Sequence, residues 1–323
     1  MSLLEVNDLR KTFVRGHGRR RRVVDAVAGV SFAVRTGETL GLVGESGCGK
    51  STTAGMVVRL VEPTSGSVRF DGTELAGMPE RRLRLLRRDL QMVFQDPQSS
   101  LNPRQTVGTI LSAPFQIQGV EPDGGVLPEV RRLMDRVGLN PEHYNRYPHQ
   151  FSGGQRQRIG IARAIALRPK LVVCDEPVSA LDVSVQAQVL NLLAGLQEEF
   201  GMAYLFVAHD LAVVRHLSER IVVMYLGRVV EQADREELYR APAHPYTKAL
   251  MAAVPRPKVP EERKKVLLTG DVGASGPVGG CPFRPRCPRY AAELNEAERA
   301  QCADEAPELV PLSPRQSAAC HFV

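Results

Sequence analysis

The chain has 323 residues, which is enough for about two domains of ordinary size. A charged fraction of 24% with 28 glycines and 23 prolines excludes wholesale disorder and collagen-like repeats. Lysine and arginine number 42 against 36 acidic residues, and this net charge of +6 suits a nucleic acid or an anionic membrane surface without deciding between them.

The N-terminal residues do not resemble a leader for secretion. Glu5 and Asp8 stand where a signal peptide is basic and then apolar, and no apolar run approaches the roughly 20 residues that cross a bilayer. We therefore expect a chain that does not itself span a membrane and whose thiols meet a reducing cytosol. A basic stretch from Arg10 to Arg22 includes four consecutive arginines from Arg19. We expect a solvated loop between two strands there, with lipid head-group contact as the alternative.

The first motif that indicates chemistry is TLGLVGESGCGKST, which matches G-x-x-x-x-G-K-[ST] between an apolar strand and a helix beginning near Lys50. Its glycines let backbone N–H groups wrap an anion, Lys50 supplies a charge for the terminal phosphates, and the Ser51 hydroxyl can ligate Mg²⁺. The candidate nucleotide-binding residues of this loop are Gly44, Glu45, Ser46, Gly47, Cys48, Gly49, Lys50, Ser51 and Thr52.

Basic residues and leucines alternate between residues 79 and 90, which predicts an amphipathic helix. We interpret its arginines as a solvated face; nucleic-acid binding is the alternative. Further along, Ser152, Gly153, Gly154 and Gln155 open a second predicted helix, whose N-terminus suits an anion and whose serine can cap it or donate to a phosphate.

An apolar strand at residues 171–174 leads into Asp175 and Glu176. Successive side chains of a strand point to opposite faces, so that one acid can hold a metal ion while the other faces the attacking water. A predicted helix follows and ends near Phe200, and the strand after it ends at His209. These elements predict strands interleaved with helices, the pattern of an α/β fold.

The order of these motifs, with FSGGQ in place of the usual LSGGQ, resembles the ATP-binding-cassette (ABC) ATPases over residues 3 to about 255. The resemblance implies a P-loop NTPase with a RecA-like core, an antiparallel β subdomain and an α-helical signature subdomain. It implies a composite site in which the loop of one subunit and Ser152, Gly153, Gly154 and Gln155 of another clamp ATP.

The resemblance also implies roles for single residues. Phe13 resembles the aromatic residue that stacks on adenine, Gln95 the Q-loop glutamine near Mg²⁺ and the attacking water, and His209 the switch histidine near the γ-phosphate. Glu176 is the candidate base, so that the catalytic set is Glu176, His209 and Gln95. Ser51, Gln95 and Asp175 are the candidate Mg²⁺ ligands.

Two further segments resemble the ATPases of oligopeptide and dipeptide importers, a group with nickel and glutathione relatives. These are VFQDPQSSLNPR, which extends the Q-loop, and AHPYTKALMAAVP near residue 250. The sequence EPVSALDVSVQAQVLNLL is closer to the F-type subunit than to the D-type. The resemblance implies a peripheral ATPase on the cytoplasmic face of the inner membrane. Its implied partners are a second ATPase, two transmembrane permeases and an extracytoplasmic peptide-binding protein. A nucleic acid is not among the expected partners.

We divide the chain into an ATPase domain (1–240) and a C-terminal extension (241–323) that is rich in proline, contains the glycine-rich stretch from Gly270 to Gly280 and has four of the six cysteines. Disulfides do not fit a cytosolic compartment, which favours metal ligation or free thiols. The five residues between the first two of these cysteines exceed the usual zinc spacing. The resemblance implies a [4Fe–4S] cluster, with zinc as the weaker alternative, on Cys281, Cys287, Cys302 and Cys320.

Two other classes of function stay open at this stage. One is a soluble ABC ATPase acting on ribosomes or DNA, which the net charge favours; such proteins commonly carry two cassettes or a long coiled-coil insertion, and this sequence has neither. The other is an ATPase whose cysteine-bearing tail senses redox state.

Overall fold

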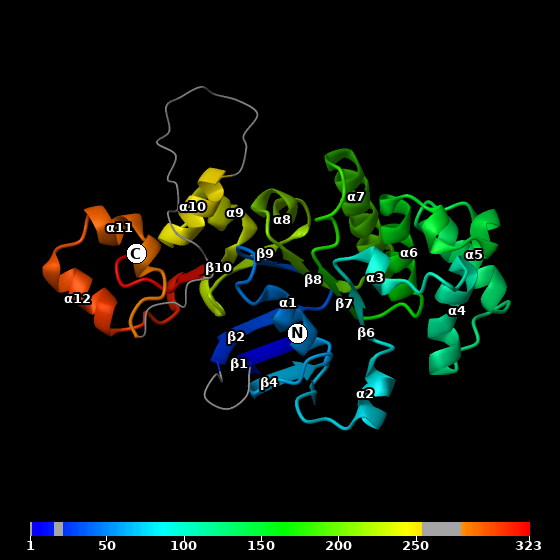
Figure 1. Ribbon diagram of the computed structural model, residues 1–323, viewed down its shortest axis with the longest axis horizontal. Coiled ribbons are helices and arrows are strands. Elements are labelled where there is room, and N and C mark those ends of the chain that lie inside the picture. The colour runs from blue at the N-terminus through cyan, green and yellow to red at the C-terminus, as the bar shows by residue number, and fades with distance from the viewer. Residues whose placement is uncertain (1, 16–21, 254–278) are drawn as a thin grey trace.

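The computed structural model describes residues 2–15, 22–253 and 279–323 (Figure 1). Residues 16–21 of the basic stretch and residues 270–278 of the glycine-rich stretch lie outside this part, so our expectations for them stay predictions. The expected loop is wrong for the rest of the basic stretch, because residues 10–15 and Arg22 lie in two paired antiparallel strands. None of the helices in the described ranges is long and apolar enough to cross a membrane.

Four N-terminal strands form an antiparallel sheet below the centre of the molecule in Figure 1. Its order is β2-β1-β4-β5, with β1 at Ser2–Arg15, β2 at Arg22–Arg35, β4 at Ser65–Phe70 and β5 at Thr73–Glu74. Leu4 and Val30 of this sheet are fully buried and belong to the same core as Met56, which lies on helix α1 (Lys50–Val57). The small sheet therefore packs onto the helix that follows the phosphate loop.

The central sheet has eight strands in the order β11-β12-β10-β9-β3-β8-β7-β6. The run from β9 to β6 is parallel and the other three strands are antiparallel. Their bounds are β3 Thr39–Val43, β6 Leu90–Val93, β7 Leu171–Asp175, β8 Ala203–Ala208, β9 Arg220–Tyr225, β10 Arg228–Asp234, β11 Val310–Ser313 and β12 Gln316–Ala318.

Helices cover both faces of the parallel strands, as β8 shows. Leu205 and Val207 point into the core that is shared with the small sheet, whereas Tyr204 and Phe206 point into the other core. That other core includes Phe115 and residues of the later helices. A strand buried on both faces is continuously apolar, which is why its sequence lacks polar alternation.

A group of helices extends from one end of the sheet, at the right of Figure 1. It contains α3 (Pro97–Ser100), α4 (Val107–Gln118), α5 (Val126–Arg136) and α6 (Gly153–Ile165). The remaining helices of the first 253 residues are α2 Glu80–Leu86, α7 Val183–Phe200, α8 Leu211–Leu217, α9 Arg235–Arg240 and α10 Pro245–Ala253.

The predicted helix over residues 79–90 is wrong at its C-terminal end. Helix α2 stops at Leu86, and Leu90 begins β6, where it pairs with Leu171. Leu90 is 4% exposed, so pairing with the sheet and burial override the helical pattern of basic residues and leucines.

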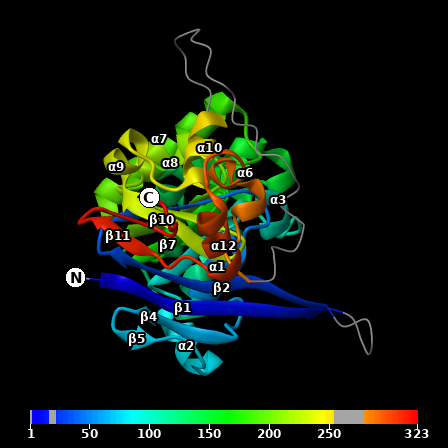
Figure 2. The ribbon, with the colours of Figure 1, turned by 90° about the vertical axis from the view of Figure 1, so that its left-hand side faces the viewer.

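The cysteine-bearing extension occupies the opposite end of the molecule from α4 and α5 (Figure 1) and contains α11 (Pro288–Ala292) and α12 (Glu296–Asp304). Figure 2 shows this end facing the viewer. Strand β12 pairs antiparallel with β10, so the central sheet continues into the extension. The predicted boundary between residues 240 and 241 stays a prediction.

Glu231 connects the cassette to the extension. This carboxylate is fully buried in β10 and accepts hydrogen bonds from the N–H groups of Ala243 and His244 and from Gln316 Nε2, each at 2.8 Å. Gln316 lies in β12, and burial lowers the pKa of the neighbouring His244 to about 3. One side chain therefore holds the start of α10 and the last strand together.

We predict that Glu231→Ala lowers the free energy of unfolding by about 3 kcal/mol, because it removes the acceptor of the buried His244 N–H and of the part-buried Ala243 N–H and leaves Gln316 Nε2 with only the Ala241 carbonyl oxygen among its described partners. Guanidinium denaturation of the full chain measures this loss. Glu236→Ala is the control: Glu236 is 80% exposed and forms a surface ion pair with the adjacent Arg235, so the expected change is below about 0.5 kcal/mol. Equal losses in the two variants would contradict the role of Glu231.

Candidate nucleotide-binding and catalytic site

The ends of three neighbouring parallel strands bring the predicted site together. Val43 of β3 is in register with Ala208 of β8, and Asp175 of β7 is in register with Val207. The residues that follow these strands, among them Gly44, Glu176 and His209, therefore emerge at one edge of the sheet. This carboxyl edge is where open α/β sheets bind ligands.

The phosphate loop needs glycine at two of its positions. A Cβ atom on Gly44 would lie 2.2 Å from the Met224 carbonyl oxygen. One on Gly49 would lie 2.3 Å from the Ala26 carbonyl oxygen, and Gly49 has φ +102°. The backbone thus passes too close to its neighbours for any side chain, which explains the spacing of the motif.

Lys50 lies in the loop with its ammonium group turned inward. The side chain is 3% exposed, and Nζ donates to the carbonyl oxygens of Gly44 (2.7 Å) and Glu45 (3.1 Å). The same nitrogen lies 3.7 Å from Glu176 Oε1. Lys50 is therefore held at the point where a phosphate would replace these oxygens as its partner.

Ser51 and Asp175 form the oxygen pair that the sequence assigns to Mg²⁺. Ser51 Oγ donates to Asp175 Oδ1 at 3.0 Å. Burial raises the pKa of Asp175, while the Ser51 hydrogen bond acts in the opposite direction. Hydroxyl and carboxylate oxygens are the ligands that Mg²⁺ prefers, so these two side chains fit that ion.

The carboxylate of Glu176 is the hub of the predicted catalytic residues. Its Oε2 accepts from Gln95 Nε2 at 3.0 Å and lies 3.2 Å from His209 Nδ1. Glu176 itself has φ +43°, a left-handed conformation that costs free energy in a residue other than glycine. The structure thus brings Gln95, Glu176 and His209 together beside Lys50.

The second predicted helix begins as the sequence indicates but lies away from the phosphate loop. Ser152 caps α6: its Oγ accepts from the Gln155 N–H, and Gln155 Oε1 accepts from the Ser152 N–H. Gly153 and Gly154 form the first turn, and a Cβ on Gly154 would lie 2.5 Å from Val185 Cγ1. Both ribbon views separate α6 from α1 (Figures 1 and 2).

Phe13 lies on β1, opposite Val24, and is 39% exposed, so its ring is available on the surface of the small sheet. Cys48 and Cys174 are both buried, and burial raises the pKa of both thiols. Both cysteines therefore behave as small apolar residues of the core.

The sequence did not reveal two residues that contact the phosphate loop. Tyr246, on α10, accepts a hydrogen bond from the Glu45 N–H at 2.9 Å, and Arg286 forms an ion pair with the Glu45 carboxylate at 2.7 Å. These residues lie about 200 positions or more from the loop, and no local motif pointed to either.

The four cysteines of the extension line one small cavity of about 20 Å³, together with His321 and residues of α10 and α11. Burial raises the pKa of Cys281 to about 11 and also raises the pKa of Cys302 and Cys320. Within the described residues, no three His, Cys, Asp or Glu side chains converge closely enough to hold one metal ion. The thiols surround a common space, and the predicted cluster stays a prediction.

Two family models match the chain. Residues 27–179 match the ABC transporter model, and residues 230–293 match the C-terminal region of oligopeptide/dipeptide transporters. The second match begins within strand β10 and includes the first two cysteines of the cavity.

Curated relatives match along nearly all of the chain. The oligopeptide transport ATP-binding protein AppF of Bacillus subtilis (strain 168) is 47% identical over 99% of this chain and 97% of its own length. OppF of Escherichia coli (strain K12), also an oligopeptide transport ATP-binding protein, is 51% identical over 88% of each chain. The dimeric structure of MJ0796, a bacterial ABC transporter cassette, superposes with a TM-score of 0.65 at 30% identity and covers 72% of this chain and 98% of that one. The chain therefore belongs to the ABC transporter ATPases that carry the oligopeptide/dipeptide transporter C-terminal region.

Proposed function

We propose that this protein hydrolyses ATP to drive the import of oligopeptides or dipeptides through an ABC importer of the inner membrane. The observation that carries the proposal is the Glu176 carboxylate, held among Lys50, Gln95 and His209 at the edge of the central sheet. The peptide assignment is supported by the C-terminal region at residues 230–293 and by relatives named oligopeptide transport ATP-binding proteins.

In the proposed reaction, the loop N–H groups and Lys50 bind the phosphates of ATP, because a concave set of donors neutralises their oxygens. Ser51, Asp175 and Gln95 would hold Mg²⁺, which when bound neutralises charge on the β- and γ-phosphates. Glu176 accepts a proton from the attacking water. His209, 3.2 Å from Glu176, orients that carboxylate and reaches toward the γ-phosphate.

One copy of the chain does not complete this site. Ser152, Gly153, Gly154 and Gln155 lie on α6, away from α1, so they would reach ATP only from an opposing subunit (Figure 1). A dimeric cassette in the related MJ0796 structure supports this arrangement. We propose a second ATPase of the same family as the partner, so that two cassettes close on ATP before hydrolysis.

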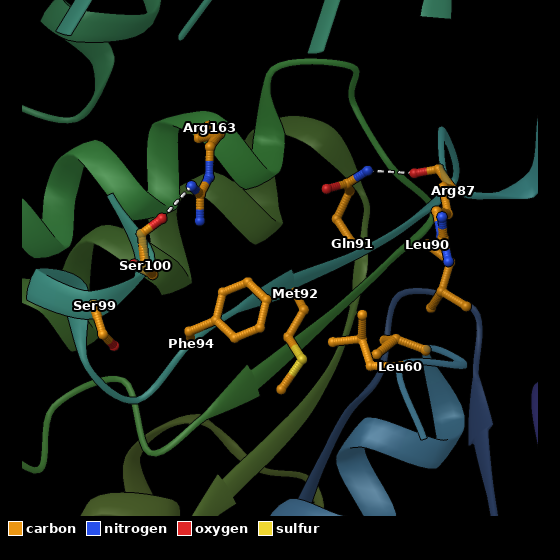
Figure 3. Close-up of a pocket in the computed structure, with 10 residues that line it drawn as sticks. Leu60, Arg87, Leu90, Gln91, Met92, Phe94, Ser99, Ser100 and Arg163 are labelled. Atoms are coloured by element: carbon orange, nitrogen blue, oxygen red, sulfur yellow. Dashed lines mark hydrogen bonds between the residues drawn. The ribbon is translucent and has the colours of Figure 1, made fainter. Parts of the chain in front are cut away.

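A groove beside the Q-loop is the proposed docking site for a permease. It encloses about 450 Å³ between the end of α1, β6, α3 and α6. Figure 3 shows Phe94 and Met92 at its centre, with Arg163 on one side and Leu60 on the other. Leu60 is 56% exposed and Phe94 37%, so both side chains are open to an occupant of the groove.

The groove combines apolar side chains with one positively charged group, the guanidinium of Arg163. Arg163 donates to the Ser100 carbonyl oxygen at 2.7 Å, and burial lowers its pKa. Phe94 precedes Gln95 in the sequence, so a segment bound in the groove would affect the hydrogen bond between Gln95 and Glu176. These features suit a short amphipathic cytoplasmic segment of a permease with an acidic residue, and they support our proposal of a peripheral subunit at the cytoplasmic face. An extracytoplasmic peptide-binding protein completes the proposed importer.

We propose that the four cysteines of the extension hold a [4Fe–4S] cluster. Cys281 and Cys287 from one turn, Cys302 from α12 and Cys320 from the C-terminal segment line the same cavity, and the ring of Phe283 lines it with them. Thiolates are the usual protein ligands of such clusters, and a bound cluster would tie these segments together. The helices and strands of residues 279–323 are short, so such a tie would stabilise this part of the extension.

For the reaction itself, we predict that Glu176→Gln leaves ATP binding intact and lowers hydrolysis at least several hundredfold, because the amide cannot accept the proton. Phosphate release by the assembled importer and equilibrium binding of a fluorescent ATP analogue measure the two effects. Near-normal turnover would remove Glu176 from the role of base.

For the groove, we predict that Leu60→Arg abolishes recovery of the permeases when the importer subunits are co-expressed and the ATPase is captured, since a charge would be buried in an apolar contact. The matched control is Leu85→Arg on α2, a leucine that is 72% exposed and outside the groove. Retained nucleotide binding shows that Leu60→Arg is folded. Full recovery of permeases with Leu60→Arg would contradict the docking site.

For the cysteine cavity, we predict that protein purified without oxygen absorbs broadly in the visible range and contains about four iron atoms per chain. Cys302→Ser should lose both signals, whereas Cys48→Ser, which alters a cysteine outside the extension, should keep them. Stoichiometric zinc without iron would show that the cavity holds a different metal.

A further inference from the structure

Arg286 of the C-terminal extension binds the side chain of Glu45 in the phosphate loop. Arg286 Nη1 lies 2.7 Å from Glu45 Oε2, and Arg286 Nη2 lies 3.0 Å from Glu45 Oε1. The pair is therefore bidentate, and its side chains are only 8% and 24% exposed. Such charge-assisted pairs are stronger and more specific than ion pairs at an open surface.

The backbone of Glu45 extends this contact to Lys50. The Glu45 N–H donates to the Tyr246 hydroxyl at 2.9 Å, and the Glu45 carbonyl oxygen accepts from Lys50 Nζ at 3.1 Å. One loop residue thus contacts Arg286 with its carboxylate, α10 with its N–H and Lys50 with its carbonyl group. A shift of Glu45 would move one of the oxygens that hold Lys50.

Arg286 is itself firmly placed. It ends the short helix at Arg284–Arg286 and directly precedes Cys287. Phe283, at the start of this turn, is 1% exposed, and its ring lies 5.2 Å from Tyr225 and 5.5 Å from Tyr246. The Arg286 guanidinium lies 5.8 Å from the centre of the Tyr225 ring. This aromatic cluster fixes the turn against the cassette.

Charge gives the ion pair a consequence for nucleotide binding. ATP brings several negative charges to a loop that already contains the Glu45 carboxylate, five positions before Lys50. An uncompensated carboxylate in this loop repels a polyphosphate, whereas a paired one does so far less.

We propose that Arg286 is a positioning residue of the ATP site: by neutralising and holding Glu45, it lets the phosphate loop accept ATP, which makes the cysteine-bearing extension a working part of the nucleotide site. The inference rests on the phosphate loop as the ATP site and needs no metal in the cysteine cavity. It predicts that the loss of ATP binding depends on salt concentration and on the charge of Glu45, which a merely structural contact would not.

The test compares the full chain with Arg286→Gln, Glu45→Gln and the double variant, by titration with a fluorescent ATP analogue in the presence of Mg²⁺. Arg286→Gln should raise Kd about tenfold, because Glu45 is left unpaired beside the phosphates. The double variant should bind at least about threefold more tightly than Arg286→Gln, because the repelling charge is gone. The defect of Arg286→Gln should shrink as salt rises, since screening weakens repulsion.

Two further variants keep the test sharp. Arg286→Lys retains the charge without the bidentate geometry, and its defect should be smaller than that of Arg286→Gln. Arg315→Gln is the matched control, because it also removes an ion pair between the extension and the cassette: Arg315 lies 3.7 Å from Asp234. Asp234 is opposite Arg220 in the pairing of β10 with β9, at the edge of the sheet far from the phosphate loop. The Kd of Arg315→Gln should stay within about twofold of the unaltered chain.

The proposal is overturned if Arg286→Gln binds the analogue as the unaltered chain does. It is equally overturned if the double variant is as weak as Arg286→Gln at every salt concentration, because the contact would then serve only the fold. A different failure is recognised with Lys50→Ala: if the unaltered chain binds no better than this variant, the phosphate loop is not the ATP site, and the proposed function falls with it.

Discussion

The common edge at which β3, β7 and β8 end is the constraint on which the site depends. Parallel pairing in register fixes the strand ends to within one residue of each other, and the residues beyond them inherit that alignment. Lys50, Asp175, Glu176 and His209 come from three separate stretches of sequence and meet only because the strands stop together. Burial of these strands on both faces makes the alignment rigid, so the polar groups at their ends are held in place.

Much of this arrangement could be predicted because each motif is local. The phosphate loop can be identified from a strand, two glycines that no other residue can replace and the start of a helix. Ser152 and Gln155 cap α6 as their spacing indicates. The failure at residues 87–90 is instructive, because arginines and leucines fit a helix surface and a strand entry equally well. The pairing of Leu90 with Leu171 decides between them, and it is 81 positions away.

The extension was the least predictable part. Its cysteines could be grouped from the sequence, but their shared cavity depends on how the last 45 residues fold against α10. The contact between Arg286 and Glu45 joins residues 241 positions apart, and neither belongs to a pattern that specifies the other. Burial around Phe283, Tyr225 and Tyr246 creates this contact, and such packing is not written in any single segment.

The pairing of β12 with β10 has a consequence for the solubility of the chain. Without it, the seven-residue strand β10 would be an edge strand with the backbone N–H and C=O groups of alternate residues unpaired, the kind of edge that pairs with strands from other molecules. The sheet ends instead at β11, a four-residue strand interrupted by Pro311, which is a poor template for further growth. A chain that ended before residue 316 would thus expose the edge of β10 to other molecules, so we expect pairing with the tail to reduce aggregation.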